Sequence, residues 1–91
     1  MSHKDRVGLE KKLDRARELV VEGGRYRHSK TGNEYVALSS GILEATEEVA
    51  VIYEAVERKG MIWIRTLENF LEEVEIEGKK VGRFVLMEEG K

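Results

Sequence analysis

The spacing of apolar residues in this chain changes at a pair of glycines, Gly23 and Gly24. Before them, apolar residues recur every three or four positions, which is the spacing of one helix face. After them, short segments alternate apolar and polar residues, which is the spacing of strands. The sequence therefore predicts one helix followed by a mainly β fold.

The segment before the glycines predicts a helix over residues 3–21. Its apolar stripe consists of Leu9, Leu13, Ala16 and Val20. Ser2 can cap the first turn, with Asp5 three residues later in the manner of a capping box. The glycine pair then ends the helix, because glycine readily adopts the left-handed conformation of a helix C-cap.

Two hairpins are predicted in the remainder. The first joins residues 25–28 to residues 34–39 and ends at the Ser-Ser-Gly sequence of 39–41, and the second places strands over 74–76 and 81–87. Between them, residues 61–65 predict a strand, and Thr66 can cap a short helical turn. Residues 42–58 fit both the helical and the strand period, so periodicity alone does not assign them.

The strand over 61–65 carries the most informative side chains. Its alternation places Ile62 and Ile64 on one face and Trp63 and Arg65 on the other. If the isoleucines face the core, Trp63 and Arg65 face solvent, where an indole beside a guanidinium can stack on a ligand. The interpretation that we favour for Trp63 is that the helix covers it and that Arg65 extends over it, because a large tryptophan tends to be well buried.

The first strand offers a similar division. Tyr26 and His28 share one face, while Arg25 and Arg27 share the other. The candidate ligand-binding residues are therefore Tyr26, His28, Trp63 and Arg65, with Arg25, Arg27 and Lys30 as further basic candidates.

Several kinds of chemistry lack the residues they need. The chain has no cysteine, which excludes disulfides, thiol nucleophiles and cysteine-bound zinc. Its two histidines, His3 and His28, are far apart, and no metal-ligand spacing surrounds them. His28 has no neighbouring motif of nucleophile and base. We therefore predict no metal, no cofactor and no catalytic residue.

The length of 91 residues predicts a single compact domain, with residues 1–22 as its helix and residues 23–91 as a small β domain. No apolar run approaches the roughly 18 residues needed to span a bilayer. The charged N-terminal segment also lacks the apolar core of a signal peptide. A cytoplasmic location is the expectation.

An ordered set of landmarks resembles the domain of unknown function 1653, a family of uncharacterised bacterial proteins. The match covers residues 23–85 and rests on Gly24-Arg25-Tyr26-Arg27-His28, Lys30, Gly32, Tyr35, Thr46, Val51-Ile52-Tyr53, Trp63-Ile64-Arg65, Phe70, Val74, Gly78-Lys79 and Arg83-Phe84. The resemblance implies a small SH3-like β-barrel and a strand that ends at Tyr53. It supplies no function. The chain departs from the family at Thr66, where a proline is usual, and lacks the histidine that usually precedes the segment 44–46.

These observations favour a non-enzymatic binding or adaptor module for a peptide, a nucleic acid or a small ligand. The net charge of −2 disfavours nonspecific nucleic-acid binding, which depends on many phosphate contacts. The basic residues are nevertheless enriched in residues 1–33, with nine Lys or Arg against five Asp or Glu. One alternative is an enzyme that gathers His28, Glu34 and Arg65. Another is a homo-oligomer formed through an exposed strand edge or the helix stripe.

Overall fold

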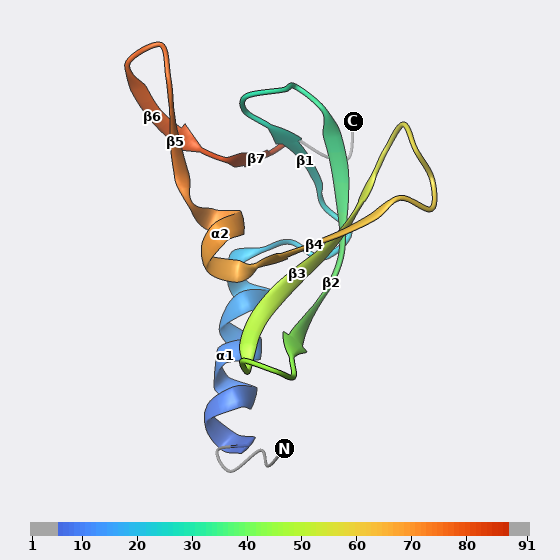
Figure 1. Cartoon of the computed structure of the whole chain (residues 1–91), viewed down its shortest axis with the longest axis vertical. Coiled ribbons are helices and arrows are strands. Elements are labelled where there is room, and N and C mark those ends of the chain that lie inside the picture. The colour runs from blue at the N-terminus through green and yellow to red at the C-terminus, as the bar shows by residue number, and fades with distance from the viewer. Residues whose placement is uncertain (1–5, 88–91) are drawn as a thin grey trace.

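The computed structural model describes residues 6–87 and confirms a mainly β fold with an N-terminal helix (Figure 1). Five strands form one antiparallel sheet in the order β4-β3-β2-β1-β7, and two strands form a separate hairpin. In chain order the elements are α1 (Arg6–Leu19), β1 (Arg25–His28), β2 (Glu34–Leu43), β3 (Glu48–Ala55), β4 (Ile62–Thr66), α2 (Leu67–Leu71), β5 (Glu73–Ile76), β6 (Lys79–Gly82) and β7 (Phe84–Leu86).

Helix α1 packs through the stripe that the sequence predicts. Leu9, Ala16 and Val20 are buried, and Leu13 is half-buried. The chain leaves the helix through Gly23, whose φ of 84° suits glycine because it has no Cβ. The proposed capping pair at the helix start lies outside the described residues.

The hairpin of β2 and β3 is longer than the sequence suggested. Strand β2 continues through Ser39, Ser40 and Gly41 instead of ending there. Its register against β3 shifts between Ala37 and Ser39, so that Leu38 forms a bulge. A bulge lets a strand bend while it stays paired with its neighbour. Strand β2 can therefore remain paired with β3 through Ser39, Ser40 and Gly41, which have low strand propensity.

The ambiguous segment contains a strand and no helix. Residues 48–55 form β3, and residues 44–47 form the turn that precedes it. Val49, Val51 and Tyr53 alternate into the protein interior and are at most 7% exposed. Periodicity fitted both a helix and a strand here. Packing on the sheet favours the strand, because β-branched and aromatic residues pack well on a pleated surface.

The second hairpin has a tight two-residue turn. Glu77 and Gly78 both have positive φ, as in the type I′ turns that suit the twist of a hairpin. The predicted strand over 81–87 is divided at Arg83, whose N–H donates to the Glu72 carbonyl at 2.8 Å. The chain then enters β7, which pairs with β1 in the main sheet.

The main sheet is strongly curled. Phe84 in β7 and Tyr53 in β3 have ring centroids 5.3 Å apart, although three strand intervals in a flat sheet span about 14 Å. Strands β4 and β7 are the two edges of this sheet and do not pair with each other, so the sheet does not close into a barrel. Phe70 of α2 stacks on Phe84 with a centroid distance of 4.3 Å and occupies the space between the two edges.

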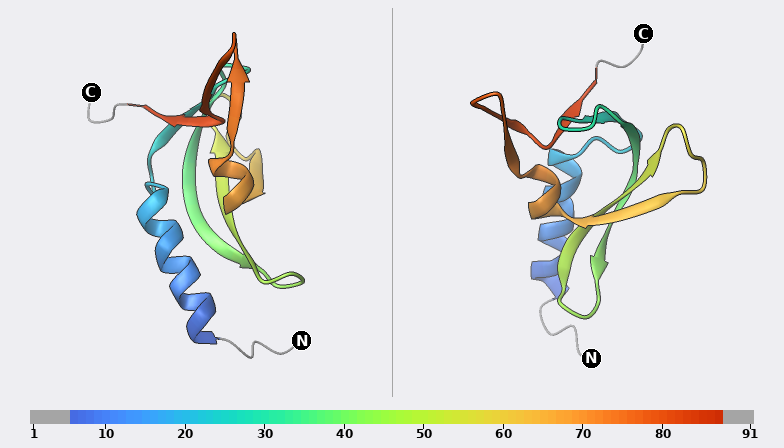
Figure 2. Two further views of the ribbon diagram at one scale, coloured as in Figure 1. Left: turned by 90° about the vertical axis from the view of Figure 1, so that its left-hand side faces the viewer. Right: turned by 45° about the horizontal axis from the view of Figure 1, so that its top comes forward.

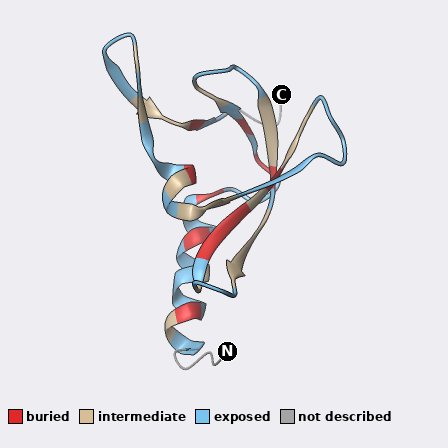
Figure 3. Ribbon diagram, in the orientation of Figure 1, coloured by how far each residue is buried: buried red, intermediate tan, exposed pale blue. Residues whose placement is uncertain are grey.

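The core lies on the inner face of this curled sheet. Figure 3 shows where its buried residues fall along the strands and helices. Val20 at the end of α1 and Phe70 in α2 both belong to it, so both helices cover the same face. Its buried members are Val20, Tyr26, Ala37, Val51, Tyr53, Phe70 and Phe84.

The molecule is more open than a typical domain of this length. Its radius of gyration is 14.1 Å, whereas about 12 Å is usual for such a chain. The hairpin of β5 and β6 stands apart from the body in Figure 1 and in the right view of Figure 2, and α1 runs alongside the β2–β3 hairpin. Within residues 6–87 no helix is long and apolar enough to cross a bilayer.

Candidate binding site

The pairing of β4 with β3 identifies which face of β4 lies on the core side of the sheet. Trp63 lies opposite Tyr53, and Arg65 lies opposite Val51, in the antiparallel register. Val51 and Tyr53 are buried, so Trp63 and Arg65 are directed toward the core side of the sheet. The interpretation in which Trp63 and Arg65 face outward is therefore wrong.

The isoleucines of β4 occupy the outer face instead. Ile62 is 47% exposed and Ile64 is 58% exposed, so neither fills the interior as the sequence predicted. They lie opposite Glu54 and Ile52, which are only partly buried. Alternation assigns the side chains of a strand to two faces, but it does not identify the face that packs on the core. In this edge strand the more apolar face is the more exposed one.

Trp63 remains 47% exposed although it lies on the inner face. The cause is its position, because β4 is the last strand of the sheet and no strand lies beyond it. The indole is therefore accessible, and the favoured interpretation that the helix covers it is wrong.

The indole forms one wall of a hollow of about 180 Å³ at the open end of the inner face. Tyr35 of β2 and Ala55 of β3 line it beside Trp63, and the turn between β3 and β4 contributes Met61 and Arg58. We call this the Trp63 hollow, and its lining residues are Asn33, Glu34, Tyr35, Ala55, Glu57, Arg58, Met61 and Trp63.

Arg65 lies deeper on the same face and joins four elements. Its Nε donates to the Tyr53 hydroxyl at 2.8 Å, and a terminal nitrogen donates to the side-chain oxygen of Asn69. The guanidinium carbon also lies 5.5 Å from the ring centroid of Phe84, within the range of a cation–π contact. Arg65 thereby links β4 to β3, α2 and β7.

A second arginine extends this polar network. Arg83 donates from Nε to the Asn69 carbonyl at 3.2 Å and from its terminal nitrogen to Glu72 at 2.7 Å. The N-cap of α2 positions Asn69, because the Asn69 backbone N–H donates to the Thr66 hydroxyl at 3.2 Å. The cap that the sequence predicted at Thr66 is therefore confirmed.

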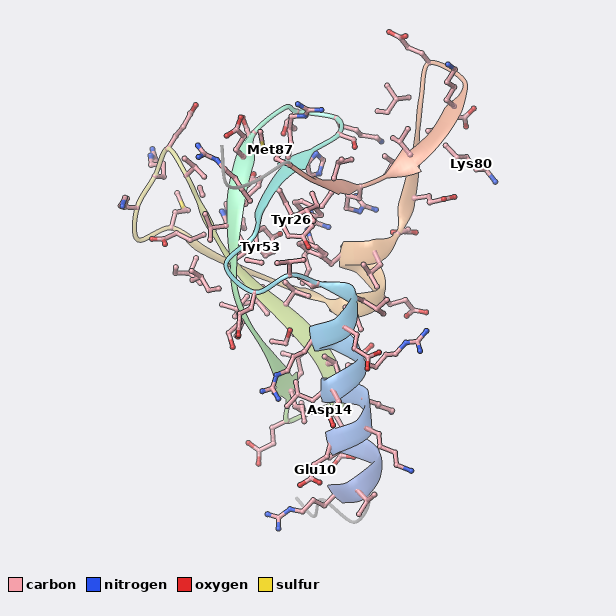
Figure 4. The ribbon with its side chains drawn as sticks, turned by 180° about the vertical axis from the view of Figure 1, so that it is seen from behind. Glu10, Asp14, Tyr26, Tyr53, Lys80 and Met87 are labelled. Atoms are coloured by element: carbon pink, nitrogen blue, oxygen red, sulfur yellow. The ribbon has the colours of Figure 1, made fainter. Side chains whose placement is uncertain are left out.

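Burial raises the pKa of Tyr53, and the hydrogen bond from Arg65 acts in the opposite direction. The Tyr53 hydroxyl therefore remains protonated and accepts from Arg65 as a neutral group. Figure 4 shows Tyr53 and Tyr26 among the side chains gathered between the sheet and α2.

His28 lies at the other side of the inner face, with its ring 5.0 Å from Phe84 in an edge-to-face arrangement. Its Nδ1 accepts from the backbone N–H of Lys30 at 3.2 Å. Burial lowers the pKa of His28, and the nearby positive charges of Arg65, Arg83 and Lys30 lower it further. The neutral imidazole therefore carries its proton on Nε2.

Tyr26 is a core residue rather than a binding residue. It is 6% exposed, and its hydroxyl accepts from the Val21 N–H at 2.9 Å. Its ring also meets Phe70 edge-on at 5.4 Å. Tyr26 thus fixes the end of α1 to the sheet.

The remaining basic candidates do not join this face. Arg25 and Arg27 are exposed on the outer side of β1, where Arg25 pairs with Glu34 at 3.0 Å. Lys30 is exposed in the turn after β1. The inner face therefore carries all four of Tyr26, His28, Trp63 and Arg65, which alternation had grouped only within each strand, and it leaves the two outer arginines apart.

The enzyme hypothesis required His28, Glu34 and Arg65 in one place. Glu34 is instead paired with Arg25, and no hydrogen bond within residues 6–87 connects it to His28. The same part of the chain contains no group of three or more His, Asp or Glu side chains that could bind a metal.

The sequence reasoning missed Tyr35 and Met61 in the hollow and Asn69 and Arg83 in the network. Tyr35 could have been found, because the first hairpin pairs it with Tyr26 on the inner face. Asn69 and Arg83 could not, since their meeting depends on how α2 packs between two sheet edges.

Comparisons with known proteins agree with this fold. A family model described as "Protein of unknown function (DUF1653)" matches residues 24–86. A crystal structure of a DUF1653 protein from Bordetella bronchiseptica is similar, with a TM-score of 0.62 and 29% sequence identity. The alignment covers 72% of this chain and 86% of that one. No curated protein matches the chain.

Proposed function

The chain belongs to the DUF1653 family of proteins of unknown function, and we propose that it is a non-enzymatic binding module that accepts a short peptide segment in the Trp63 hollow. The observation that carries this proposal is the hollow itself. It sets a half-exposed indole beside Tyr35 and Met61 at the rim of the aromatic core.

The size of the hollow favours one side chain of a peptide over a metabolite. Its volume is about 180 Å³. Pockets for drug-sized small molecules typically enclose about 300–1,000 Å³. A peptide needs less, because it can insert a single side chain and lay its backbone across the rim.

The chemistry of the walls favours an apolar side chain. Tyr35, Met61 and Trp63 offer flat or flexible apolar surfaces, which suit a prolyl ring, a leucine or a methionine. Aromatic-lined grooves of this kind bind extended proline-containing segments in several small β domains, because such segments are already ordered before binding. We therefore expect proline-containing peptides to bind best.

The charges around the hollow support a peptide over a nucleic acid. Arg58 lines it together with Glu34 and Glu57, so the rim carries both signs. Single-stranded nucleic acid binds best where a basic groove follows its phosphates. The mixed rim instead suits a partner whose backbone is neutral.

A larger hollow of about 440 Å³ lies between α1 and the end of β2. Leu9, Leu13 and Ile42 form its apolar part, and no aromatic residue lines it. It serves as the competing site in the tests below.

The intrinsic fluorescence of Trp63 tests the proposal, because it is the only tryptophan in the chain. We would titrate short proline-containing peptides, matched peptides with alanine in place of proline, and a single-stranded oligonucleotide. We expect a saturable change with the proline-containing peptides and a weaker change with the alanine peptides. A saturable response to the oligonucleotide alone would contradict the peptide assignment.

Two charged variants localise the response while retaining the reporter. Met61→Lys places an ammonium in the hollow at a side chain that is already 37% exposed. Val7→Lys places the same charge on α1 at a residue that is 62% exposed. Binding should weaken at least about tenfold in Met61→Lys, because the new charge must be desolvated, and should be unchanged in Val7→Lys. Equal affinity in both variants would remove the hollow as the site.

A further inference from the structure

We propose that the open edge of β4 pairs with β4 of a second copy of this chain, forming a two-fold symmetric dimer with a continuous sheet across the interface. This inference goes beyond the peptide site and rests on the backbone of β4, its exposed side chains and the register that a two-fold axis would impose.

The backbone of β4 has one set of hydrogen-bonding groups directed away from the sheet. Met61 accepts from the Ala55 N–H at 3.2 Å, which fixes the alternation of the β3–β4 ladder. Met61, Trp63 and Arg65 therefore bond toward β3, and the N–H and C=O groups of Ile62 and Ile64 point to the open edge. These outward groups are a template for another strand.

The side chains in the middle of this edge do little to prevent pairing. Exposed edge strands commonly carry lysine, proline or an inward-pointing charge. Strand β4 has no lysine or proline, and its one charged residue, Arg65, donates to Tyr53 and Asn69 near the end of the strand. Here three consecutive apolar residues, Ile62, Trp63 and Ile64, are 47%, 47% and 58% exposed. The other free edge belongs to β7, which has only three residues.

A second copy fits this edge because β4 is complementary to itself. With the two-fold axis at Trp63, the outward groups of Ile62 in one copy meet those of Ile64 in the other. The two indoles then face each other as a non-hydrogen-bonded pair, in which cross-strand side chains lie closest. Arg65 faces Met61, so no like charges meet.

The two-fold axis also has a consequence for the inner faces. Residues directly opposite each other in an antiparallel pair lie on the same side of the sheet. The two Trp63 hollows would therefore open on the same side of the dimer. The exposed isoleucines of both copies would gather on the opposite side.

Sedimentation velocity over a concentration series of the full chain tests the dimer. We expect the wild-type chain to self-associate reversibly. Ile64→Lys should raise the dissociation constant about 10- to 30-fold, because each dimer loses two apolar cross-strand pairs. Val7→Lys, with the same charge at an exposed residue of α1, should leave association unchanged.

Mixing two variants tests the register. Ile62→Glu alone should also weaken self-association. In a mixed dimer of Ile62→Glu with Ile64→Lys, the new carboxylate lies opposite the new ammonium, and the second pair remains isoleucine with isoleucine. Association of the mixture should exceed that of either variant alone, and added salt should reduce the gain.

Each remaining outcome overturns the proposal. A wild-type chain that is monomeric at the highest attainable concentration excludes the dimer. The dimer is also excluded if such a monomer instead binds an extended peptide of another protein along the β4 edge. A dimer that Ile64→Lys does not weaken uses another surface. Failure of the mixture to associate more strongly than its components excludes the axis at Trp63. Peptide binding in the hollow is measured separately, by Trp63 fluorescence at one fixed protein concentration and in Ile64→Lys as well as the wild type. Because association then contributes the same background throughout a titration, either proposal can fail without the other.

Discussion

Arg65 illustrates how one side chain can hold together sheet edges that the backbone leaves unpaired. Its guanidinium donates to Tyr53 and Asn69 and lies over Phe84. No carboxylate within the described residues forms an ion pair with it. The sequence placed Arg65 on a binding surface, whereas its contacts give it mainly a structural role beside that surface.

Removing the hydroxyl of Tyr53 should therefore weaken the fold. We expect Tyr53→Phe to lower the free energy of unfolding by about 1–2 kcal/mol, because the Arg65 Nε loses its acceptor while the guanidinium keeps its other contacts. Tyr35→Phe is the matched control, since the Tyr35 hydroxyl has no hydrogen bond to the described residues. Urea denaturation followed by circular dichroism measures both. Equal effects in the two variants would contradict the role assigned to Arg65.

The histidine on the inner face predicts a dependence of stability on pH. The pKa of His28 is lowered in the folded chain from its ordinary value of 6.5, first by burial and then by the nearby arginines and Lys30. The unfolded chain therefore binds this proton more readily than the folded chain. The contribution of neutral His28 to the free energy of unfolding should be fully present above pH 6.5 and should be lost as the pH falls through the lowered pKa.

Thermal unfolding of the wild type and His28→Gln at neutral pH and at about pH 5 measures this effect. The carboxylates contribute equally to both proteins, so the difference between them isolates His28. We expect the wild type to lose more stability on acidification than the variant. An identical loss would show that the histidine does not couple its protonation to folding.

At the scale of elements, the sequence predicted those features that depend on residues close together in the chain. The helix stripe, the first hairpin and the cap at Thr66 follow from spacing and turn residues, and the structure contains all three. It could not predict that β2 would continue past Ser39, because the bulge at Leu38 is stabilised by pairing with β3. Nor could it orient Ile62 and Ile64, since an edge strand can present its more apolar face to solvent.

The joint between α1 and β1 depends on close backbone packing at Gly24. A Cβ at this position would lie 2.9 Å from the Val21 carbonyl oxygen and 3.1 Å from the Leu86 side chain. We expect Gly24→Ala to destabilise the fold by about 1–3 kcal/mol, because the helix must shift away from the sheet. Differential scanning calorimetry would record this change as a lower melting temperature.

Gly41 provides the matched control for that substitution. A Cβ there would lie 3.7 Å from the Ile52 side chain, which is an ordinary contact. Gly41→Ala should therefore be neutral or stabilising by up to about 1 kcal/mol, since alanine loses less backbone entropy than glycine. Equal destabilisation by the two substitutions would show that contact at the α1–β1 joint is not the cause.

At the scale of the whole molecule, an unclosed sheet creates both proposed surfaces. Closing the barrel by pairing β4 with β7 would satisfy the edge of β4 and remove the exposure of Trp63. Instead Phe70 of α2 packs against Phe84 of β7 and Tyr53 of β3, and these ring contacts hold the sheet in its curled form. The hollow and the free edge are therefore consequences of one architectural feature.

The central claim is that the Trp63 hollow binds a peptide side chain, and backbone amide NMR of the full chain during titration with a proline-containing peptide tests it most directly. We predict that the largest chemical-shift changes occur at Tyr35, Ala55, Met61 and Trp63, with saturation at the affinity measured by fluorescence. Shifts concentrated instead at Leu9, Leu13 and Ile42, with none at the hollow, would contradict the claim.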